Sequence, residues 1–583
     1  MNGVPPIVNS SGLFISARDQ LLRLREEHTA AQAQFQWPTV TQFNWVGDYF
    51  DVIARDNARI ALRVVDDSGH DIRLSYSDLS RRAGQVANYL AANGVGPGDR
   101  VLIMLGNVVP LWETMLGCIK LGAVIIPAST LLQRNDLADR LERGQVKAII
   151  TEVSHIERLA DLRGAPIRIS IGGPVPGWLD YADTRAAPCA FVPKQLTRAD
   201  DLLLLYFTSG TTARPKLVAQ THESYPIGHL STMYWIGIKP GDVHLNLSSP
   251  GWAKHAWSSF FAPWNAEATV LAYQYDRFNA QALLNQLVRC GVTTFCAPPT
   301  VWRMLIQEEL ERWPVQLREV TSAGEPLNPE VIERVRSAWG LTIRDGFGQS
   351  ETTALVGNSP GQTVKLGSMG RPLPGCPVVL IAPDGAVADE GEICVDLSAR
   401  PVGLMQVYID DHERTAEAMR GGYYHTGDVA ARDSDAYLTY VGRMDDLFKC
   451  SDYRISPFEI ESVLIEHPAV AEAAVVPSPD LLRLAVPKAF IVLAQGQVAD
   501  LETARSIFAH IRSRVSPYKR IRRLEFSELP KTISGKIRRV DLRRAEQERG
   551  AEGARRPLEF WEEDLAAGET IAGHAPSLPH DIK

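Results

Sequence analysis

Short runs of consecutive apolar residues alternate along the chain with longer segments in which apolar residues recur every three or four positions. The short runs, at residues 100–105, 148–150, 270–272 and 293–296, are typical of strands that are buried on both faces. The longer segments between them have the period of amphipathic helices. This alternation predicts α/β layers, with helices packed on a mainly parallel sheet.

One of these helices can be followed residue by residue. Ser77 is a suitable N-cap and Gly94 a suitable end. Its apolar face is formed by Leu79, Ala83, Val86, Ala87 and Leu90. We expect this helix to belong to the scaffold.

The pattern changes beyond Gly442. Ser456, Pro457 and Glu459 give an N-cap, a first-turn proline and a capping-box acid, which together predict the start of a helix. Strands are expected at residues 470–476, 489–493 and 523–526, with a helix at 503–515, so this part is a small α+β domain. Beyond Arg544 the periodicity is lost.

The chain has 583 residues, of which 45% are hydrophobic and 22% charged, and it is too long for one core. We therefore expect a large multi-layered N-terminal domain with α/β subdomains at 1–444, a small C-terminal domain at 445–545 and a polar tail at 546–583.

Charge and cysteine content exclude several classes of protein. The net charge of -8 gives no chain-wide basic surface for nucleic acid. The seven cysteines lack paired spacing, so neither a disulfide framework nor a zinc site is predicted. The N-terminus has no signal-peptide pattern and no apolar stretch is long enough for a membrane span. We expect a cytoplasmic protein without membrane insertion.

A hydroxyl-rich loop follows the apolar run at residues 202–207. Hydroxyl and backbone donors come from Thr208, Ser209, Gly210, Thr211 and Thr212. With Lys216 at its rim, the loop suits polyphosphate, although its spacing is not that of the Walker loop. An ordinary solvated loop is the alternative.

A second glycine-rich segment carries an aromatic residue and an acid. It consists of Asp345, Gly346, Phe347, Gly348, Gln349, Ser350, Glu351 and Thr352. Such a loop can lie along a ligand and reach a cation with the carboxylate of Glu351. The alternative is a surface turn with a solvated glutamate.

Five segments in this order resemble the adenylate-forming superfamily, which includes acyl-CoA synthetases and luciferases. They are residues 208–216, 345–352, 424–428, 442–449 and 530–536. Ala213 stands where that family usually has glycine. The resemblance covers residues from about 50 to 544 and implies an acetyl-CoA synthetase-like fold, in which the small domain is mobile.

The resemblance also implies ATP, Mg²⁺ and coenzyme A as cofactors, and it assigns residues to them. Glu351 and Thr208 would hold the metal, and Asp428 would accept hydrogen bonds from the ribose hydroxyls. The loop beside adenine would contain Gly324, Glu325 and Pro326.

The predicted catalytic residues are Lys536, Glu351, Arg443 and Lys216. Lys536 would bridge the α-phosphate and the attacking carboxylate. From composition alone, the alternative is that Lys536 is one of several positive charges in a basic segment. Asp445 would be the hinge between the domains. Arg454 and Arg483 would contact the phosphates of coenzyme A.

Residues 251–257 and 449–459 look like the medium-chain acyl-CoA synthetase branch. The predicted function is therefore ATP-dependent, AMP-forming ligation of a medium-chain fatty or aromatic acid to coenzyme A. Gly348 replaces a tryptophan of acetate-specialised relatives, so a longer acid is expected, with Trp252 as the best pocket candidate. The helical spacing of four other aromatic residues favours the core: Trp257, Phe260, Phe261 and Trp264.

One departure from the branch leaves the acceptor open. Asp452 replaces a glycine whose backbone lines the pantetheine channel, and a Cβ there could narrow that channel. An amine or a carrier protein is the alternative acceptor, and a non-catalytic nucleotide-binding homologue is the second alternative. The oligomeric state is also open, a homodimer being one option.

Overall fold

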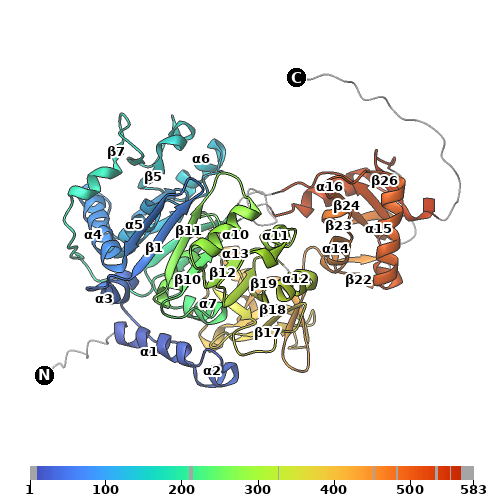
Figure 1. Ribbon diagram of the computed structural model, residues 1–583, viewed down its shortest axis with the longest axis horizontal. Coiled ribbons are helices and arrows are strands. Elements are labelled where there is room, and N and C mark those ends of the chain that lie inside the picture. The colour runs from blue at the N-terminus through green and yellow to red at the C-terminus, as the bar shows by residue number, and fades with distance from the viewer. Residues whose placement is uncertain are drawn as a thin grey trace. The chain divides into compact units, whose positions relative to one another are not determined.

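A computed structural model describes residues 10–208, 215–325, 327–450, 453–480, 484–531, 536–551 and 553–565. The chain divides between Tyr440 and Val441 into a large N-terminal and a small C-terminal unit (Figure 1). This division is close to the domain boundary predicted at residues 444–445.

In the large unit the described residues form a seven-stranded sheet in the order β7-β6-β5-β3-β4-β8-β9, parallel except for the β8/β9 pair. Its strands are β3 Arg100–Met104, β4 Val124–Pro127, β5 Ala148–Glu152, β6 Ile167–Ile171, β7 Leu179–Asp180, β8 Leu202–Thr208 and β9 Lys216–Thr221. Val101 and Ile103 pack with α4 (Tyr76–Ala92) and α5 (Val109–Leu121). Leu102 and Met104 face the opposite side, with α6 (Arg134–Arg143). Both faces are buried, as the continuous apolar runs predicted.

Helix α4 begins two residues earlier than the sequence predicted. Ser75 is its N-cap and forms a capping box with Asp78, so the expected cap at Ser77 is wrong. The hydroxyl of Ser77 instead donates to the carbonyl of Ala54 at 2.7 Å. Ser75 is favoured because an acid three residues later completes the reciprocal pair of hydrogen bonds.

A thirteen-stranded sheet of described residues has the order β17-β18-β19-β20-β16-β15-β14-β13-β12-β10-β11-β1-β2. Its strands are β1 Ile60–Asp66, β2 Asp71–Ser75, β10 Val243–Asn246, β11 Thr269–Gln274, β12 Thr294–Ala297, β13 Glu319–Ala323, β14 Arg344–Gly348, β15 Ala354–Gly357, β16 Ser368–Pro372, β17 Val378–Ile381, β18 Glu390–Asp396, β19 Tyr423–Arg432 and β20 Leu438–Arg443. Three helices pack on Leu245, Leu271 and Phe295 of this sheet. They are α10 Ala280–Arg289, α11 Pro299–Leu305 and α12 Pro329–Trp339.

The main core of the large unit lies on the other face of this sheet, where Val270 and Ala272 share one cluster with α4 and α5. A helical stretch of α8 Ala253–Ala256, η4 Trp257–Phe261 and α9 Ala262–Asn265 contributes to it. Phe260, Phe261 and Trp264 are fully buried there, as their helical spacing predicted. The other helices of the unit include α1 Ser10–Arg23, α2 His28–Gln34, α3 Asp51–Ala54, α7 His229–Ile236 and α13 His412–Ala418.

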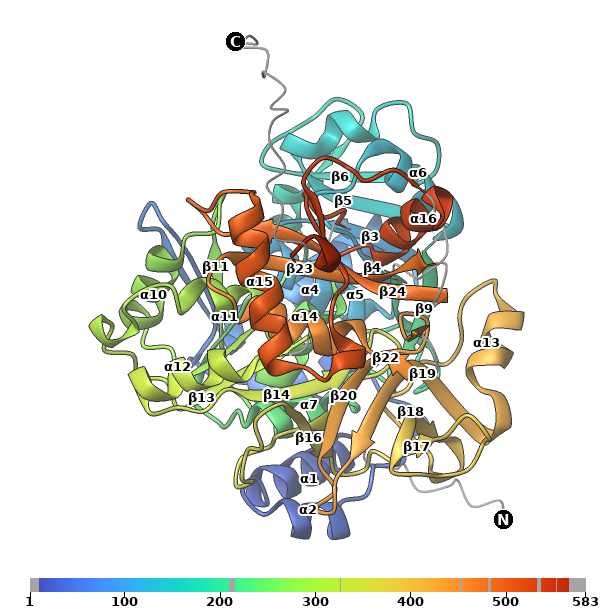
Figure 2. The ribbon, with the colours of Figure 1, turned by 90° about the vertical axis from the view of Figure 1, so that its right-hand side faces the viewer.

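The small unit contains a four-stranded sheet, β23-β24-β25-β26, and a hairpin of β21 and β22. Its elements are β21 Phe448–Cys450, β22 Tyr453–Ile455, α14 Pro457–Ile465, β23 Val470–Asp480, β24 Leu484–Leu493, α15 Leu501–Arg514, β25 Arg523–Phe526, α16 Arg539–Arg549 and β26 Glu559–Trp561. Ala473 and Val475 pack with α14 and α15, which cover one face in Figure 2, whereas Ala474 and Val476 pack with α16. The helix start predicted at Ser456 is confirmed.

The predicted polar tail is wrong for its first part. Helix α16 continues to Arg549, and β26 pairs antiparallel with β25. The acids that suggest a solvated tail are ion-pair partners inside the unit, since Lys488 Nζ lies 3.0 Å from Glu546 and 3.2 Å from Glu559. Residues 566–583 lie outside the described part of the chain. Every described helix is too short or too polar to cross a bilayer.

Candidate active site

The hairpin of β8 and β9 carries the predicted phosphate loop. Thr208, the last residue of β8, pairs with Lys216, the first residue of β9. The loop between them, with Ser209, Gly210, Thr211 and Thr212, lies outside the described residues. Pro215, which directly precedes β9, accepts at its carbonyl from Arg143 at 3.0 Å.

Lys216, Glu351 and Tyr408 form a cluster beside this hairpin. The Tyr408 hydroxyl donates to Oε1 of Glu351 at 2.9 Å, and Lys216 Nζ lies 4.0 Å from the same oxygen. Lys216 also donates to the Tyr408 hydroxyl at 3.3 Å. Burial, together with the charge of Glu351, raises the pKa of Tyr408, so the phenol keeps its proton. The structure thus brings together two predicted site residues and adds Tyr408.

Strand β14 brings the second predicted segment to this site, and its glycines allow close packing. A Cβ on Gly346 would lie 2.3 Å from the indole of Trp235, and one on Gly348 would lie 2.4 Å from the carbonyl oxygen of Thr353. Neither position has room for a side chain. Asp345 is buried, accepts the amide of Gly346 at 2.9 Å, and has its pKa raised by burial to about 8.

The residues that follow β14 are fixed by local contacts. The backbone amide of Gln349 donates to Oγ1 of Thr352 at 2.9 Å, and the carbonyl of Ser350 accepts from the side-chain amide of Gln220 at 3.0 Å. Phe347 is half-buried against the main core. These contacts hold the turn that presents Glu351.

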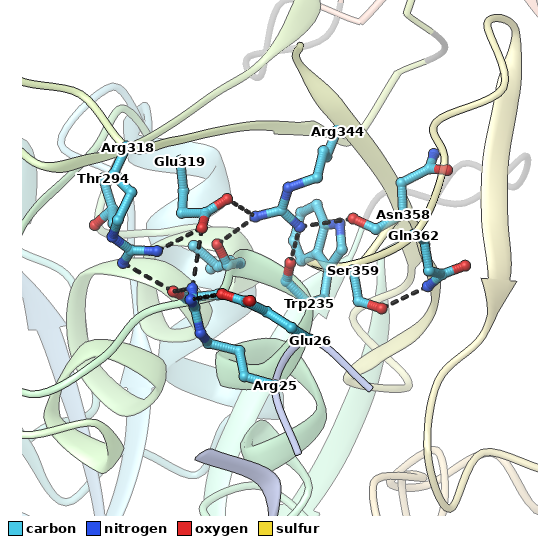
Figure 3. A network of polar contacts seen from close by, with 12 residues as sticks. Arg25, Glu26, Trp235, Thr294, Arg318, Glu319, Arg344, Asn358, Ser359 and Gln362 are labelled. Atoms are coloured by element: carbon cyan, nitrogen blue, oxygen red, sulfur yellow. Dashed lines mark hydrogen bonds and ion pairs between the residues drawn. The ribbon is translucent and has the colours of Figure 1, made fainter. Parts of the chain in front are cut away.

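An arginine and glutamate network supports β14 from its N-terminal end (Figure 3). Arg344 lies 2.7 Å from Oε2 of Glu319 and donates to the carbonyl of Asn358 at 2.6 Å. Arg25 lies 3.0 Å from the other oxygen of Glu319, and Arg318 pairs with the same carboxylate. Because these groups are largely buried, their pairing fixes where β14 starts.

Asp428 is buried, and each of its oxygens has a neutral donor. Gln349 Nε2 donates to Oδ2 at 2.6 Å, and the Tyr440 hydroxyl donates to Oδ1 at 3.1 Å. Tyr424 in turn donates to Oε1 of Gln349 at 2.8 Å. The carboxylate predicted to bind ribose is therefore linked directly to the segment that carries Glu351.

The turn before Asp428 is held by Glu392. Oε1 of Glu392 accepts the amide of Gly427 at 2.9 Å, and Oε2 lies 2.7 Å from Nδ1 of His425. The Cys394 sulfur lies 3.4 Å from the same nitrogen. These three side chains could approach one metal ion, but Arg420 lies 3.5 Å from Glu392. The hydrogen bonds alone account for the cluster, which positions Asp428.

The predicted adenine-side loop follows β13. Gly324 has φ +104°, and a Cβ there would meet no atom within 4 Å, so its conformation rather than its space requires glycine. Glu325 accepts from the Thr300 hydroxyl at 3.1 Å and lies 3.6 Å from Arg303. Pro326 lies outside the described residues.

Trp252, the predicted pocket residue, is half-buried directly before α8, and the remaining predicted residues lie in the small unit. Lys536 is exposed on a loop whose two sides are joined by a bridge between Lys531 and Ile537. Arg443 Nε lies 3.5 Å from Asp445, whose carbonyl accepts from Arg543 at 2.9 Å. The backbone of Arg454 pairs with Lys449 in the β21/β22 hairpin. The side chain of Arg454, and all of Asp452 and Arg483, lie outside the described part.

Sequence reasoning missed Tyr408 and Tyr440. Tyr408 is 57 residues from Glu351, and Tyr440 is 12 residues from Asp428 across a change of strand. Neither residue lies in one of the five matching segments. An isolated bridge between Tyr408 and Val218, and the pairing of β19 with β20, bring these phenols to the two acids.

Comparison with known proteins agrees with this geometry. The family model described as AMP-binding enzyme matches residues 50–409, and the AMP-binding enzyme C-terminal domain matches residues 459–536. A 4-hydroxybutyrate–CoA ligase 1 of Metallosphaera sedula is 42% identical over 88% of this chain and 92% of its own length. The mitochondrial acyl-coenzyme A synthetase ACSM3 of Mus musculus is 38% identical over 83% and 86%.

Solved structures give the same result. The anthranilate CoA ligase AuaEII in complex with anthranoyl-AMP has a TM-score of 0.79 and 28% identity, over 87% of this chain and 98% of its own. A benzoate CoA ligase from Burkholderia xenovorans LB400 has a TM-score of 0.75 and 28% identity, over 86% and 100%. These matches confirm the predicted fold class and superfamily: the chain belongs to the AMP-binding enzyme family, among the acyl-CoA synthetases of the adenylate-forming superfamily.

Proposed function

We propose that this chain is an ATP-dependent, AMP-forming acyl-CoA ligase. In the first step an oxygen of a carboxylic acid bonds to the α-phosphorus of ATP, the bond to the bridging oxygen breaks, and pyrophosphate leaves. In the second step the sulfur of coenzyme A bonds to the acyl carbon and AMP leaves. The observation that carries this proposal is the cluster of Lys216, Glu351 and Tyr408 beside the end of β8.

Electrostatics explains the proposed roles. The acid and the α-phosphate are both anions, so a cation that contacts both removes their repulsion and aligns the attack. Lys536, exposed on its loop, is proposed for this task, and Lys216 for the leaving phosphates. Arg443 is proposed to contact phosphate or ribose, Asp445 to be the hinge, and Arg454 and Arg483 to contact coenzyme A.

The residues near β8 fit a magnesium ion. A buried carboxylate from Glu351 and a hydroxyl from Thr208 are hard oxygen donors, which Mg²⁺ prefers. When bound, Mg²⁺ neutralises charge on the phosphate oxygens as pyrophosphate leaves. Tyr408 orients the Glu351 carboxylate through its hydrogen bond.

The relatives are named for 4-hydroxybutyrate, anthranilate and benzoate, which differ in size and shape. The medium-chain or aromatic acid predicted from the sequence stays a prediction.

Exchange of radiolabelled pyrophosphate into ATP tests the first step. We expect exchange that depends on a carboxylic acid and on Mg²⁺, and that stops when EDTA is added. Absence of exchange with every acid of a broad panel would favour the non-catalytic homologue. Absence of an EDTA effect would contradict the metal assignment alone.

A comparison of acceptors tests the second step. We expect coenzyme A to accelerate AMP release once acyl adenylate has formed. If coenzyme A leaves AMP release unchanged while an amine or a carrier protein accelerates it, then Asp452 has closed the route to the thioester and the alternative acceptor is correct.

A further inference from the structure

The segment of residues 24–28, between α1 and α2, reaches both ends of the hairpin that presents Glu351. This hairpin consists of β14 and β15, which pair antiparallel, and Glu351 lies in the turn between them. The segment lies outside residues 50–409, the range that the AMP-binding enzyme model matches. That match therefore does not account for the contacts that the segment makes.

The start of the hairpin is held through Arg25. Its guanidinium lies 3.0 Å from Oε1 of Glu319, and Oε2 of Glu319 lies 2.7 Å from Arg344, the first residue of β14 (Figure 3). Arg25 also donates to the carbonyl of Gly237 at 3.2 Å, and Arg344 donates to that of Ile236 at 2.7 Å. The side chains of Arg25 and Glu319 are only 15% and 13% exposed, so water screens their attraction weakly.

The end of the hairpin is held through His28. Its Nδ1 accepts from Gln362 at 3.1 Å and lies 3.3 Å from the hydroxyl of Ser359, two residues beyond β15. Burial lowers the pKa of His28 to about 4, so the ring is neutral at neutral pH and Nδ1 can accept. A Cβ on Gly361 would lie 2.0 Å from the carbonyl oxygen of Glu26, so the two backbones are in close contact.

We infer that residues 24–28 form a strap that positions the turn carrying Glu351, with Arg25 as its main positioning residue. This inference rests on the proposed function, in which Glu351 binds Mg²⁺. A hairpin that is fixed at both ends keeps its turn in one place, whereas a hairpin released at its start samples several positions. The apparent affinity for the metal then falls with the fraction of molecules whose turn is correctly placed.

The first test compares Arg25→Met with the unchanged enzyme in pyrophosphate exchange at varied Mg²⁺ concentration. The half-saturating concentration should rise by about fivefold, because fewer molecules are in the binding-competent state. At saturating Mg²⁺ the kcat should fall much less. A loss of stability alone would lower the amount of active enzyme and leave the half-saturating concentration as it is.

Two further measurements do not depend on activity. Electron paramagnetic resonance follows the binding of Mn²⁺ together with an ATP analogue that has a methylene bridge between its α- and β-phosphates. The affinity for Mn²⁺ should weaken in Arg25→Met by the same factor as for Mg²⁺. Hydrogen exchange of residues 345–357 without ligands should become faster, because the hairpin opens locally more often.

The matched control is Arg23→Met, since Arg23, the last residue of α1, is exposed. It removes the same side chain and charge and should leave all three measurements unchanged. Arg25→Lys keeps the charge without the fork of donors, so its values should lie between those of Arg25→Met and the unchanged enzyme. If Arg25→Met does not fold, Arg25→Lys provides the test, and a smaller change in the same direction is expected.

Either of two results in a folded Arg25 variant would overturn the inference while leaving the proposed function intact. One is an unchanged affinity for Mn²⁺, and the other is unchanged hydrogen exchange of residues 345–357. Absence of pyrophosphate exchange with every acid in the unchanged enzyme would instead remove the proposed function. The two measurements that do not depend on activity would still decide whether the strap positions the turn.

Discussion

Gln349 donates its side-chain amide to Oδ2 of Asp428 at 2.6 Å, which ties the segment of the proposed metal ligand to the proposed ribose ligand. The other oxygen of Asp428 accepts from Tyr440 at 3.1 Å. Both donors are neutral groups, and together they orient the carboxylate, as recognition of two ribose hydroxyls requires.

Replacing Gln349 by glutamate tests this relationship. Gln349→Glu sets two carboxylates against each other, so the KM for ATP should rise by about tenfold or more at neutral pH. Steady-state kinetics with varied ATP measures the effect. Gln497→Glu adds the same charge at an exposed position and should leave the KM unchanged. An unaltered KM in Gln349→Glu would show that Asp428 does not contact the nucleotide.

Lys536 is expected to serve only the first half-reaction. Lys536→Ala should abolish pyrophosphate exchange because no cation then joins the two anions, yet it should spare thiolation of supplied acyl adenylate. The two rates are measured separately. Lys531→Ala on the same loop removes a lysine that pairs with Glu472 at 2.7 Å, and it should retain exchange. Equal loss of both steps in Lys536→Ala would contradict this division.

Asp345 predicts a pH-dependent difference in stability. Its pKa is raised by burial from 3.8 to about 8, so the folded state keeps a proton that the unfolded state loses. Between these values the free energy of unfolding falls as pH rises, by about 1.4 kcal/mol for each pH unit. The Asp345→Asn variant has no carboxyl group at this position, so its free energy of unfolding does not fall with pH for this reason.

Denaturant unfolding of the unchanged protein and of Asp345→Asn at pH 5, 6, 7 and 8 measures the difference. The variant should become progressively more stable, relative to the unchanged protein, as pH rises. A difference that stays constant across this range would mean that Asp345 is ionised throughout.

The ion pairs of Lys488 predict that the stability of the small unit depends on the segment that carries Glu546 and Glu559. This fully buried ammonium lies 2.6 Å from Glu525, 3.0 Å from Glu546 and 3.2 Å from Glu559. Lys488→Met leaves these acids without their common cation and should lower the free energy of unfolding by about 3–5 kcal/mol.

Hydrogen exchange of residues 441–565 would locate this loss in the small unit. Lys531→Met breaks an exposed pair instead, and it should cost no more than about 1 kcal/mol. Equal stability of the two variants would show that the buried cluster contributes nothing.

The sequence predicted the features that depend on neighbouring residues. The N-cap at Ser456 and the strand at residues 523–526 were both found, because capping and burial periodicity are visible within a few positions. The order of the five matching segments was enough to identify the superfamily. This local reasoning gave the wrong N-cap at Ser77, because Ser75 can cap the same helix and forms a capping box with Asp78.

By itself, then, the sequence determined the superfamily, the layered α/β architecture and most of the residues proposed for the chemistry. Tertiary structure alone decided which distant groups meet. Tyr408 contacts Glu351, Trp257 packs against Gly348, and Lys488 pairs with Glu546, which the sequence placed in a polar tail. The physical reason is that such contacts depend on how strands pair and helices pack. Those choices are made over the whole chain, and no short window of residues contains them.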